Sequence, residues 1–217
     1  FAKHFTARVD LGYQSRHITT DRYYGPTTYF ARNTGRPGIE GGTAQLQVTD
    51  EYSTVLTNHN TLEWKQTFES DHNVSVLVGE ETVIRKGETK NQYGFGYKGS
   101  YDVLNGEIFN YLGQAAYSEF TNYVDPRDNQ LSFLARANYD YKGRYYITAT
   151  FRADCSTRFA EGNQWGYFPS AALAWRMSDE EWMQGASSWL SNMKFRLSLG
   201  MAGNNNVDLG YLHPDFL

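Results

Sequence analysis

The sequence lacks the features on which a disulfide-bonded scaffold or a helical membrane protein depends. Its only cysteine is Cys155, so no disulfide can form within the chain, whereas a small secreted scaffold would carry several cysteines. The longest uninterrupted apolar run, Ala171 to Trp175, is far shorter than the roughly 20 residues that a membrane-spanning helix needs. Both classes of protein are therefore excluded.

The chain also lacks an excess of charge and is poor in proline. With 20 basic and 24 acidic residues its formal net charge is −4, and no basic run suggests a surface that follows nucleic-acid phosphates. Only 5 prolines accompany 20 glycines and 17 tyrosines, which is typical of many strands and turns because aromatic side chains suit a pleated surface. The composition predicts an all-β protein with no nucleic-acid partner.

Alternation of apolar and polar residues is the clearest pattern between Asn129 and Met201. From Leu131 to Tyr141 every second residue is apolar or aromatic, and the same pattern recurs from Tyr145 to Ala153. The three residues between these runs, Lys142 to Arg144, form an odd-length loop, which keeps both apolar faces on one side. The sequence therefore predicts a hairpin with one apolar and one polar face.

Other runs bring the expected number of strands to about seven. They are Phe5 to Tyr13, Val74 to Val78, Ala171 to Trp175, Phe195 to Met201, and the polar but β-prone stretch from Gly42 to Phe68, interpreted as one long strand. Between the last two strands, Ser178 and Glu181 have the spacing of a capping box and Gly185 is a stop signal. This spacing predicts a short helix within Ser178 to Met193.

The expected connections are of two lengths. Short ones lie at Glu69 to Asp71 and Lys142 to Arg144, and long loops are expected at Gln14 to Gly41, Gly79 to Asn129 and Cys155 to Gly166. Short turns at one end of the strands and long loops at the other are typical of an outer-membrane β-barrel. A mean hydropathy of −0.62 is compatible with a barrel, because only every second side chain meets lipid.

A soluble β-sandwich explains the alternation equally well, since its apolar faces would cover a core. Three features favour the antiparallel transmembrane barrel: charges on the polar face, strands near the ~10 residues that cross a bilayer, and tyrosines near strand ends. We expect an interfacial girdle formed by Tyr139, Tyr141, Tyr145 and Tyr146. We also interpret Trp165, Tyr167 and Phe168 as membrane-interface anchors rather than a sugar-stacking site.

No pattern predicts a catalytic, cofactor or metal site. The five histidines are far apart in sequence and form no zinc-binding pair with a neighbouring carboxylate: His4, His17, His59, His72 and His213. Gly94, Gly96 and Gly99 match a dinucleotide motif in spelling only, because no helical pattern follows, and we expect a flexible loop there. Asp179 to Glu181 are expected to stabilise the first turn of the short helix.

The polar face of the hairpin holds the residues that could act in transport. Arg136, Asn138, Arg152 and Asp154 could line a lumen and touch a solute or a plug. Pairing of these side chains with one another inside the wall is the alternative. If Arg152 or Asp154 lines a solute path, removing its charge should alter uptake without lowering the abundance of the barrel.

Two long segments resemble the SusC/RagA family of TonB-dependent outer-membrane transporters. They are YDYKGRYYITATFRADCSTRF, Tyr139 to Phe159, and WGYFPSAALAWRMSDEEWM, Trp165 to Met183. WLSNMKFRLSLGMAGN, Trp189 to Asn204, is similar in spacing, and weaker similarity reaches NTLEWKQTF, Asn60 to Phe68, so that nearly the whole chain is covered. The family has glycine at the position of Cys155, so we expect a different local loop conformation here.

The resemblance implies a large plugged barrel, for which 22 strands are typical, so the chain, residues 1–217, is expected to be a partial β-barrel domain. Nothing in it resembles the family's plug domain, its TonB box or the strand that closes the barrel. About seven strands would keep open edges, so we expect the isolated chain to aggregate or fail to insert.

The resemblance also implies a function. The complete protein would lie in the bacterial outer membrane and import an oligosaccharide or peptide, driven through TonB and the plug, beside a SusD-like surface lipoprotein. It would be no enzyme, and no cofactor is implied. A soluble carbohydrate-binding sandwich is the alternative, and a glycan-active enzyme, which needs two converging carboxylates, ranks last.

Overall fold

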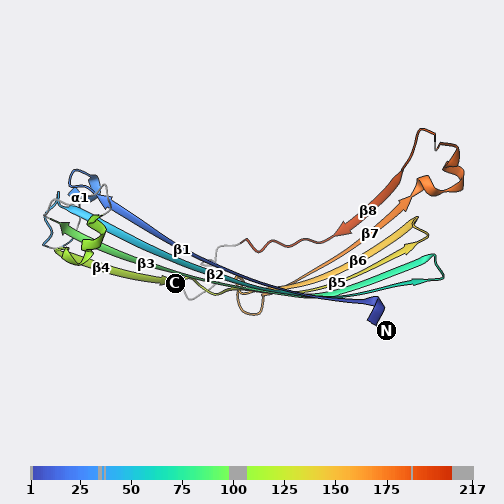
Figure 1. The fold of residues 1–217 in the computed structure, drawn as a ribbon, viewed down its shortest axis with the longest axis horizontal. Helices are drawn as coiled ribbons and strands as arrows, with labels where there is room; N and C mark the ends of the chain where they lie inside the picture. Colours follow the sequence, from blue (N-terminus) through green and yellow to red (C-terminus); the bar gives the residue numbers. More distant parts are fainter. Residues whose placement is uncertain (1, 34–35, 37, 98–106, 187, 207–217) are drawn as a thin grey trace. The chain divides into compact units, whose positions relative to one another are not determined.

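The structure of the chain is a computed structural model that describes residues 2–33, 36, 38–97, 107–186 and 188–206. Its regular elements are strands, one short α-helix and four 3₁₀ segments (Figure 1). In chain order they are η1 (Ala2–His4), β1 (Phe5–Tyr24), α1 (Tyr29–Arg32), β2 (Ala44–Phe68), β3 (His72–Tyr97), η2 (Glu107–Gln114), β4 (Tyr117–Val124), β5 (Asp128–Tyr141), β6 (Tyr145–Ser156), β7 (Trp165–Arg176), η3 (Met177–Asp179), η4 (Glu181–Ala186) and β8 (Lys194–Gly200). None of the helices in these ranges has the length and apolar character that crossing a membrane requires.

The residues form two compact units, which we describe separately. Unit 1 comprises Phe1–Tyr13, Leu56–Ile84 and Arg127–Leu217, and unit 2 comprises Gln14–Val55 and Arg85–Pro126. The strands of unit 1 follow the order β1-β2-β3-β5-β6-β7-β8, so each neighbour in the sheet is the next strand of that unit along the chain. Such a meander is the topology of an up-and-down barrel wall.

The register of unit 1 confirms the predicted hairpin. β5 and β6 are antiparallel with Tyr141 opposite Tyr145, and β7 continues the pattern with Trp175 opposite Tyr145. Lys142 and Gly143 have φ values of 53° and 64° in the connecting turn, a left-handed conformation that glycine adopts readily. Because the loop has three residues, both strands present their apolar side chains on the same face.

The apolar face of unit 1 is exposed. Phe195, Leu197 and Leu199 of β8 keep 59%, 61% and 84% of their surface accessible. They continue the rows formed by the apolar residues of β6 and β7, whose large side chains are also exposed: Tyr145, Ile147, Phe151, Trp165, Tyr167 and Leu173. A sandwich would bury this face against a second sheet, so the arrangement does not favour the soluble alternative.

Unit 2 has a small core of its own. Ala44, Leu46, Tyr97 and Ile108 are buried together, with Tyr23, Phe109, Leu112 and Ala115 packed around them. The core joins the ends of β2 and β3 to η2, and the Tyr97 hydroxyl donates a hydrogen bond to the Leu112 carbonyl at 3.1 Å. β4 pairs with β3 in this unit, from Phe95 opposite Tyr117 to Glu88 opposite Val124.

The long loops expected from the sequence are partly wrong. β1 continues to Tyr24 and β3 to Tyr97, and β4 is an additional strand, so the structure describes eight strands where about seven were expected. Gly94 and Gly96 lie in β3 rather than in a loop, and Gly99 is outside the described residues. The stretch from Gly42 to Phe68 does contain a single strand, β2, as predicted.

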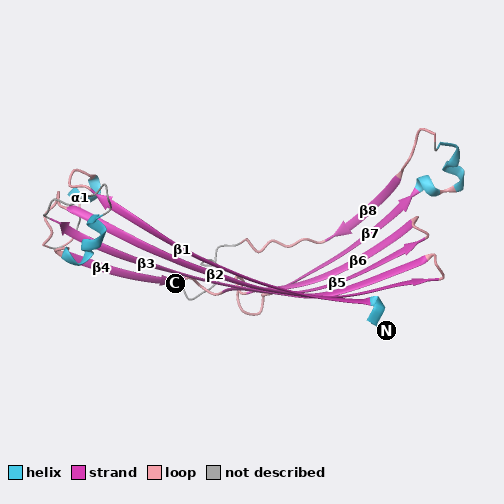
Figure 2. Ribbon diagram, in the orientation of Figure 1, coloured by secondary structure: helices cyan, strands magenta, loops and turns pink. Residues whose placement is uncertain are grey.

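The predicted helix between Ser178 and Met193 is also wrong in detail. Two 3₁₀ segments, η3 and η4, flank Glu180, whose φ and ψ of −80° and 144° are extended (Figure 2). Ser178 lies inside η3 and its hydroxyl donates to Asp179, so no capping box forms. Cys155 likewise lies in regular strand, opposite Leu131 and Trp165, rather than in an altered loop.

Candidate functional site

The polar face of unit 1 brings the predicted site residues onto neighbouring strands. Arg136 lies opposite Thr150, Asn138 opposite Thr148, and Arg152 on β6 faces Leu134 on one side and Phe168 on the other. Since side chains alternate along a strand, all of them point away from the exposed apolar face. In a barrel whose apolar face meets lipid, this polar face is the inner one.

Arg152 is the centre of a charged network on this face. Its Nε donates to both oxygens of Asp154 at 2.7 and 2.9 Å, and its second terminal nitrogen donates to Glu81 at 3.3 Å and to the Ser132 hydroxyl at 3.1 Å. Three strands, β3, β5 and β6, are thereby connected through one guanidinium. The pairing of Arg152 with Asp154 is the alternative that the sequence left open.

Asn138 and Arg136 differ in how strongly neighbouring side chains hold them. The Asn138 amide donates to Ser75 at 3.0 Å and accepts from Thr148 at 2.9 Å, so it bridges β3, β5 and β6. Arg136 is exposed and makes one long hydrogen bond, 3.4 Å, to Thr150. Of the four predicted residues, Arg136 is therefore the most available to a solute.

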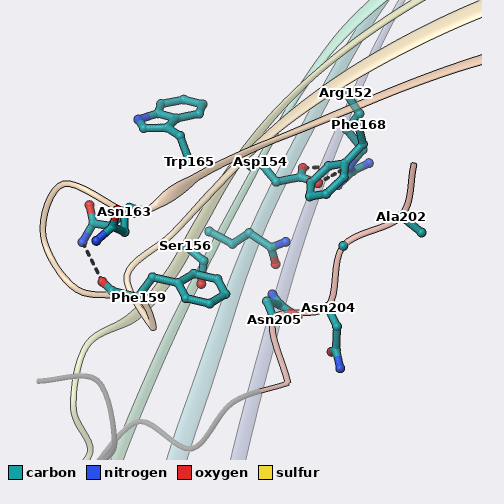
Figure 3. A pocket seen from close by; sticks show the side chains of 14 residues that line it. Arg152, Asp154, Ser156, Phe159, Asn163, Trp165, Phe168, Ala202, Asn204 and Asn205 are labelled. Carbon is teal, nitrogen blue, oxygen red and sulfur yellow. Dashed lines mark hydrogen bonds and ion pairs between the residues drawn. The ribbon is translucent and has the colours of Figure 1, made fainter. Parts of the chain in front are cut away.

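A hollow of about 450 Å³ opens beside the Arg152 network, a volume suited to a small ligand. Amide side chains are the most frequent polar groups of its lining: Gln130, Asn163, Gln164, Asn204 and Asn205. Figure 3 shows Asp154 and Phe168 on one side of the hollow and Asn204 and Asn205 on the segment that faces them. Amides offer both donors and acceptors, so they suit a neutral ligand rich in hydroxyl or amide groups.

Backbone contacts hold the segment that follows β8 against β7. The Met201 amide donates to the Pro169 carbonyl at 3.0 Å. Gly203 lies so close to the ring of Phe168 that a Cβ atom there would clash with it. Phe168 therefore packs inside the hollow rather than anchoring a membrane interface, and the sequence interpretation of this residue was wrong. Trp165 and Tyr167 do lie on the exposed apolar face.

The turn between β6 and β7 is fixed by a partly buried ion pair. Arg158 donates to both carboxylate oxygens of Asp128 at 3.0 and 2.8 Å, and this bidentate contact raises the pKa of the guanidinium. The Thr157 hydroxyl donates to the Arg127 carbonyl at 2.8 Å and accepts from the Asn129 amide at 2.8 Å. These contacts preorganise one rim of the hollow.

At the short-turn end of unit 1, Glu180 binds the aromatic row of the apolar face. Its carboxylate accepts from the Tyr145 hydroxyl at 2.6 Å, from Trp175 Nε1 at 2.9 Å and from Arg144 at 3.2 Å. These donors, the Tyr145 hydroxyl first, hold the pKa of Glu180 below its ordinary value. Sequence reasoning missed this contact because it assigned Glu180 to a helix.

Three of the four tyrosines expected to form an interfacial girdle lie on one face of the sheet. Tyr139, Tyr141 and Tyr145 share the apolar face, and the rings of Tyr141 and Tyr145 stack at 6.3 Å. Tyr146 has the opposite orientation and lies on the polar face, because successive side chains of a strand alternate. The alternation of residues along the strand was sufficient to place Tyr146 on the opposite face from the other three tyrosines.

The histidines behave as single polar side chains. Within the described part of the chain no group of three or more metal-ligating side chains could hold an ion. His17 pairs with Asp50 at 3.0 Å, His59 lies 3.7 Å from Asp10, and His72 contacts the Tyr139 hydroxyl at 2.7 Å. His4 contacts the Lys65 carbonyl, and His213 is outside the described residues.

Sequence comparison places the chain among TonB-dependent receptors. TonB-dependent receptor P39 of Formosa agariphila is 31% identical over 151 residues, which are 69% of this chain and 14% of that protein. TonB-dependent receptor SusC of Bacteroides thetaiotaomicron is 40% identical over 88 residues, 40% of this chain and 9% of SusC. No family model matches the chain. The chain thus spans about a seventh of P39.

Solved structures agree on the fold. The structure of the RagAB peptide transporter matches 94% of this chain and 21% of its own, with a TM-score of 0.79 and 22% sequence identity. The same importer in its open-open state matches 96% of the chain with a TM-score of 0.74. The meander with its exposed apolar face, the relatives and this fold together identify the chain as part of the β-barrel of a SusC/RagA-type TonB-dependent receptor.

Proposed function

We propose that the complete protein is a TonB-dependent transporter of the bacterial outer membrane that imports oligosaccharides or peptides, and that this chain supplies wall and lumen lining. One observation carries the proposal: unit 1 has an exposed apolar face and, on the reverse side of the same strands, a charged and amide-rich face. Lipid on one side and a wet lumen on the other is the environment that suits both faces.

The domain assignment belongs to the same proposal. The chain forms part of the barrel domain, and the plug, the TonB box and the remaining strands would come from other parts of a larger protein. Coupling to the proton gradient of the inner membrane would act through TonB and that plug. The relatives are receptors and a transporter, which supports a non-enzymatic function.

The hollow on the polar face is the proposed point of solute contact. It combines the Arg152 and Asp154 pair with amides and with Phe159, a surface that suits sugar rings or peptide backbones. A SusD-like surface lipoprotein is the proposed partner at the long-loop end. RagAB, which matches this chain in fold, is described as a peptide transporter, which supports a peptide as one of the two solute classes.

Uptake by cells that carry the complete gene tests the proposal. Import of labelled oligosaccharide and peptide pools should be lost on deletion of the gene, restored by complementation, and abolished by a protonophore that removes the proton gradient. Pull-down of the tagged protein from outer membranes should recover a surface lipoprotein. Import that persists without the gene or without the gradient would contradict the proposal.

Arg152→Gln tests the hollow itself, and Arg136→Gln tests the exposed arginine elsewhere on the same polar face. Arg152→Gln removes the charge that holds Asp154 and Glu81, so we expect solute uptake to change while the amount of folded barrel in the outer membrane stays within about twofold. If uptake by Arg152→Gln equals that of the parent protein, the charged pair of Arg152 and Asp154 does not lie on the solute path.

A further inference from the structure

The polar face of unit 1 carries a cluster of positive charge at its short-turn end, separate from the hollow. Arg176 at the end of β7 lies directly opposite Lys194 at the start of β8, and Arg196 lies opposite Ala174. The Lys194 ammonium is 3.6 Å from the centre of the Tyr146 ring, and the Arg176 guanidinium lies 5.8 Å from the same ring. We name Arg176, Lys194 and Arg196 the basic patch.

Only one of the three residues of the basic patch forms an ion pair with a carboxylate among the described residues. Arg176 pairs with Asp179 at 3.3 Å, yet its Nε is buried without a hydrogen-bond partner. Lys194 and Arg196 have no ion-pair partner in the part of the chain that the structure describes. Asp140, the acidic residue of the same polar row, already accepts from Asn73 and from the Gly143 amide. Like charges on directly opposed residues destabilise a sheet, so the patch needs an anionic neighbour.

Location restricts what that neighbour can be. The patch lies on the face opposite Trp175 and Phe195, so lipid headgroups on the outer surface cannot reach it. Tyr146 and Arg152 are six residues apart on β6, which places the patch about 20 Å along the strand from the charged network of the hollow. A solute bound at the hollow therefore does not neutralise the patch, and a passing solute would leave it uncompensated between transport events.

We infer that the basic patch docks a carboxylate-bearing protein segment enclosed by the barrel, which the arginine and lysine side chains hold by charge-assisted hydrogen bonds. This inference rests on the proposed function in one respect, namely that the polar face is the inner face of the barrel. A cation–π contact with the Tyr146 ring holds the Lys194 ammonium in place on the polar face. The segment would be a permanent neighbour that fixes an interior element against β7 and β8.

Photo-crosslinking in the full-length protein in outer membranes tests this inference. A photoreactive p-benzoylphenylalanine replaces Ala174, which lies on the polar face between Tyr146 and Arg196, so all three charges of the patch stay in place. The matched control replaces Leu173, the preceding residue, whose side chain lies on the apolar face. We expect position 174 to yield a crosslink to a segment of the protein that contains Asp or Glu, and position 173 to yield none.

A charge series separates docking from simple proximity. Lys194→Gln with Arg196→Gln should lower the yield of the position-174 crosslink by about tenfold or more, whereas Lys194→Arg with Arg196→Lys should retain it. A crosslink to a segment without carboxylates, to the strand that pairs with β8, or no crosslink above the control would overturn the inference. So would a yield that the Gln variants leave unchanged.

The readout does not depend on transport. If the acidic crosslink forms but the protein imports neither solute class, the proposed function fails and the docking inference stands. If import occurs without the crosslink, the docking inference alone fails.

Discussion

The two units of the chain differ in whether their apolar side chains are buried or exposed. Unit 2 buries Leu46 and Ile108 to 1% exposure and packs further aromatic and aliphatic side chains around them. Unit 1 turns a whole face of aliphatic and aromatic side chains outward and buries little of it: Val83 and Ala153 are the buried apolar residues among its described positions. A water-soluble protein rarely exposes such a continuous apolar face.

The strands of the two units are therefore stabilised in different ways. In unit 2 the strands are held by a local hydrophobic core of the ordinary kind. In unit 1 the backbone ladder and the polar-face network hold the sheet, and the apolar face gains its stability only if lipid or detergent covers it.

The largest effect is expected from removing lipid altogether. The isolated chain, residues 1–217, should aggregate in buffer without detergent, because the exposed face and the unpaired edges of β1 and β8 would associate. Size-exclusion chromatography with and without detergent measures this directly. A monodisperse, folded preparation in plain buffer would show that unit 1 is stable without a lipid-like surface, contrary to this expectation.

A core substitution should affect unit 2 and leave unit 1 intact. Leu46→Ala creates a cavity in the buried cluster and should cost about 2–5 kcal/mol of local stability. Limited proteolysis of the full-length protein should then cut within 14–55 and 85–126 while the strands of unit 1 stay protected. Phe120→Ala in β4, where the ring is exposed, is the control and should leave the cleavage pattern unchanged.

Two neighbouring alanines of β7 offer a matched test of unit 1. Ala171 lies on the apolar face between Ala149 and Leu199, and Ala172 lies on the polar face between Thr148 and Ser198. Ala171→Arg puts a charge into hydrocarbon and should destabilise the barrel by about 2–4 kcal/mol, whereas Ala172→Arg should be tolerated. Heat-modifiable migration of the full-length protein on gels measures the folded fraction. Equal losses in both variants would argue against a lipid-facing side.

The smallest effect is expected at Glu180. Because the pKa of this carboxylate is held below its ordinary value of 4.5, its stabilising contribution is complete above that pH and is lost as the pH falls through the lower value of the folded protein. The melting temperature of the parent should therefore exceed that of Glu180→Gln near neutral pH, and this gap should narrow as the pH falls below 4.5.

Glu181→Gln is the control for that series. Glu181 is exposed in η4, so this variant should melt with the parent protein at every pH. A gap between the parent and Glu180→Gln that stays constant over the whole acid range in which the protein remains folded would show that the carboxylate of Glu180 does not act through its charge on Tyr145 and Trp175.

The sequence predicted unit 1 far better than unit 2, for a physical reason. Where one face meets lipid and the other water, alternation is strict, and the runs in β5 to β8 are legible residue by residue. The continuation of β3 from Glu80 to Tyr97 carries polar residues on both faces, so no apolar period marks it as strand. Four consecutive residues at its end are buried, and Tyr97 among them packs with Ile108 of η2, a segment that the sequence did not indicate.

The site was predictable in its position but not in its contacts. Alternation placed Arg136, Asn138, Arg152 and Asp154 on one face, and the structure agrees. The bond from Arg152 to Glu81 joins residues 71 positions apart, and such a contact depends on the order of strands in the sheet. Glu180 was wrongly assigned to a helix because the residues around it have capping-box spacing. Nothing in the sequence indicates that its carboxylate accepts hydrogen bonds from Tyr145 and Trp175.

Whether the apolar face of unit 1 meets lipid can be measured at the two faces of β8 in the full-length protein. After replacement of Cys155 by serine, a spin label is attached in turn to cysteines at Leu197 and Ser198, which lie on opposite faces. In proteoliposomes, we expect oxygen, which dissolves in lipid, to relax the label at position 197 more strongly than the label at position 198. A water-soluble nickel complex should relax the label at position 198 more strongly than the label at position 197. Equal access of the nickel complex to both labels would contradict a lipid-facing wall.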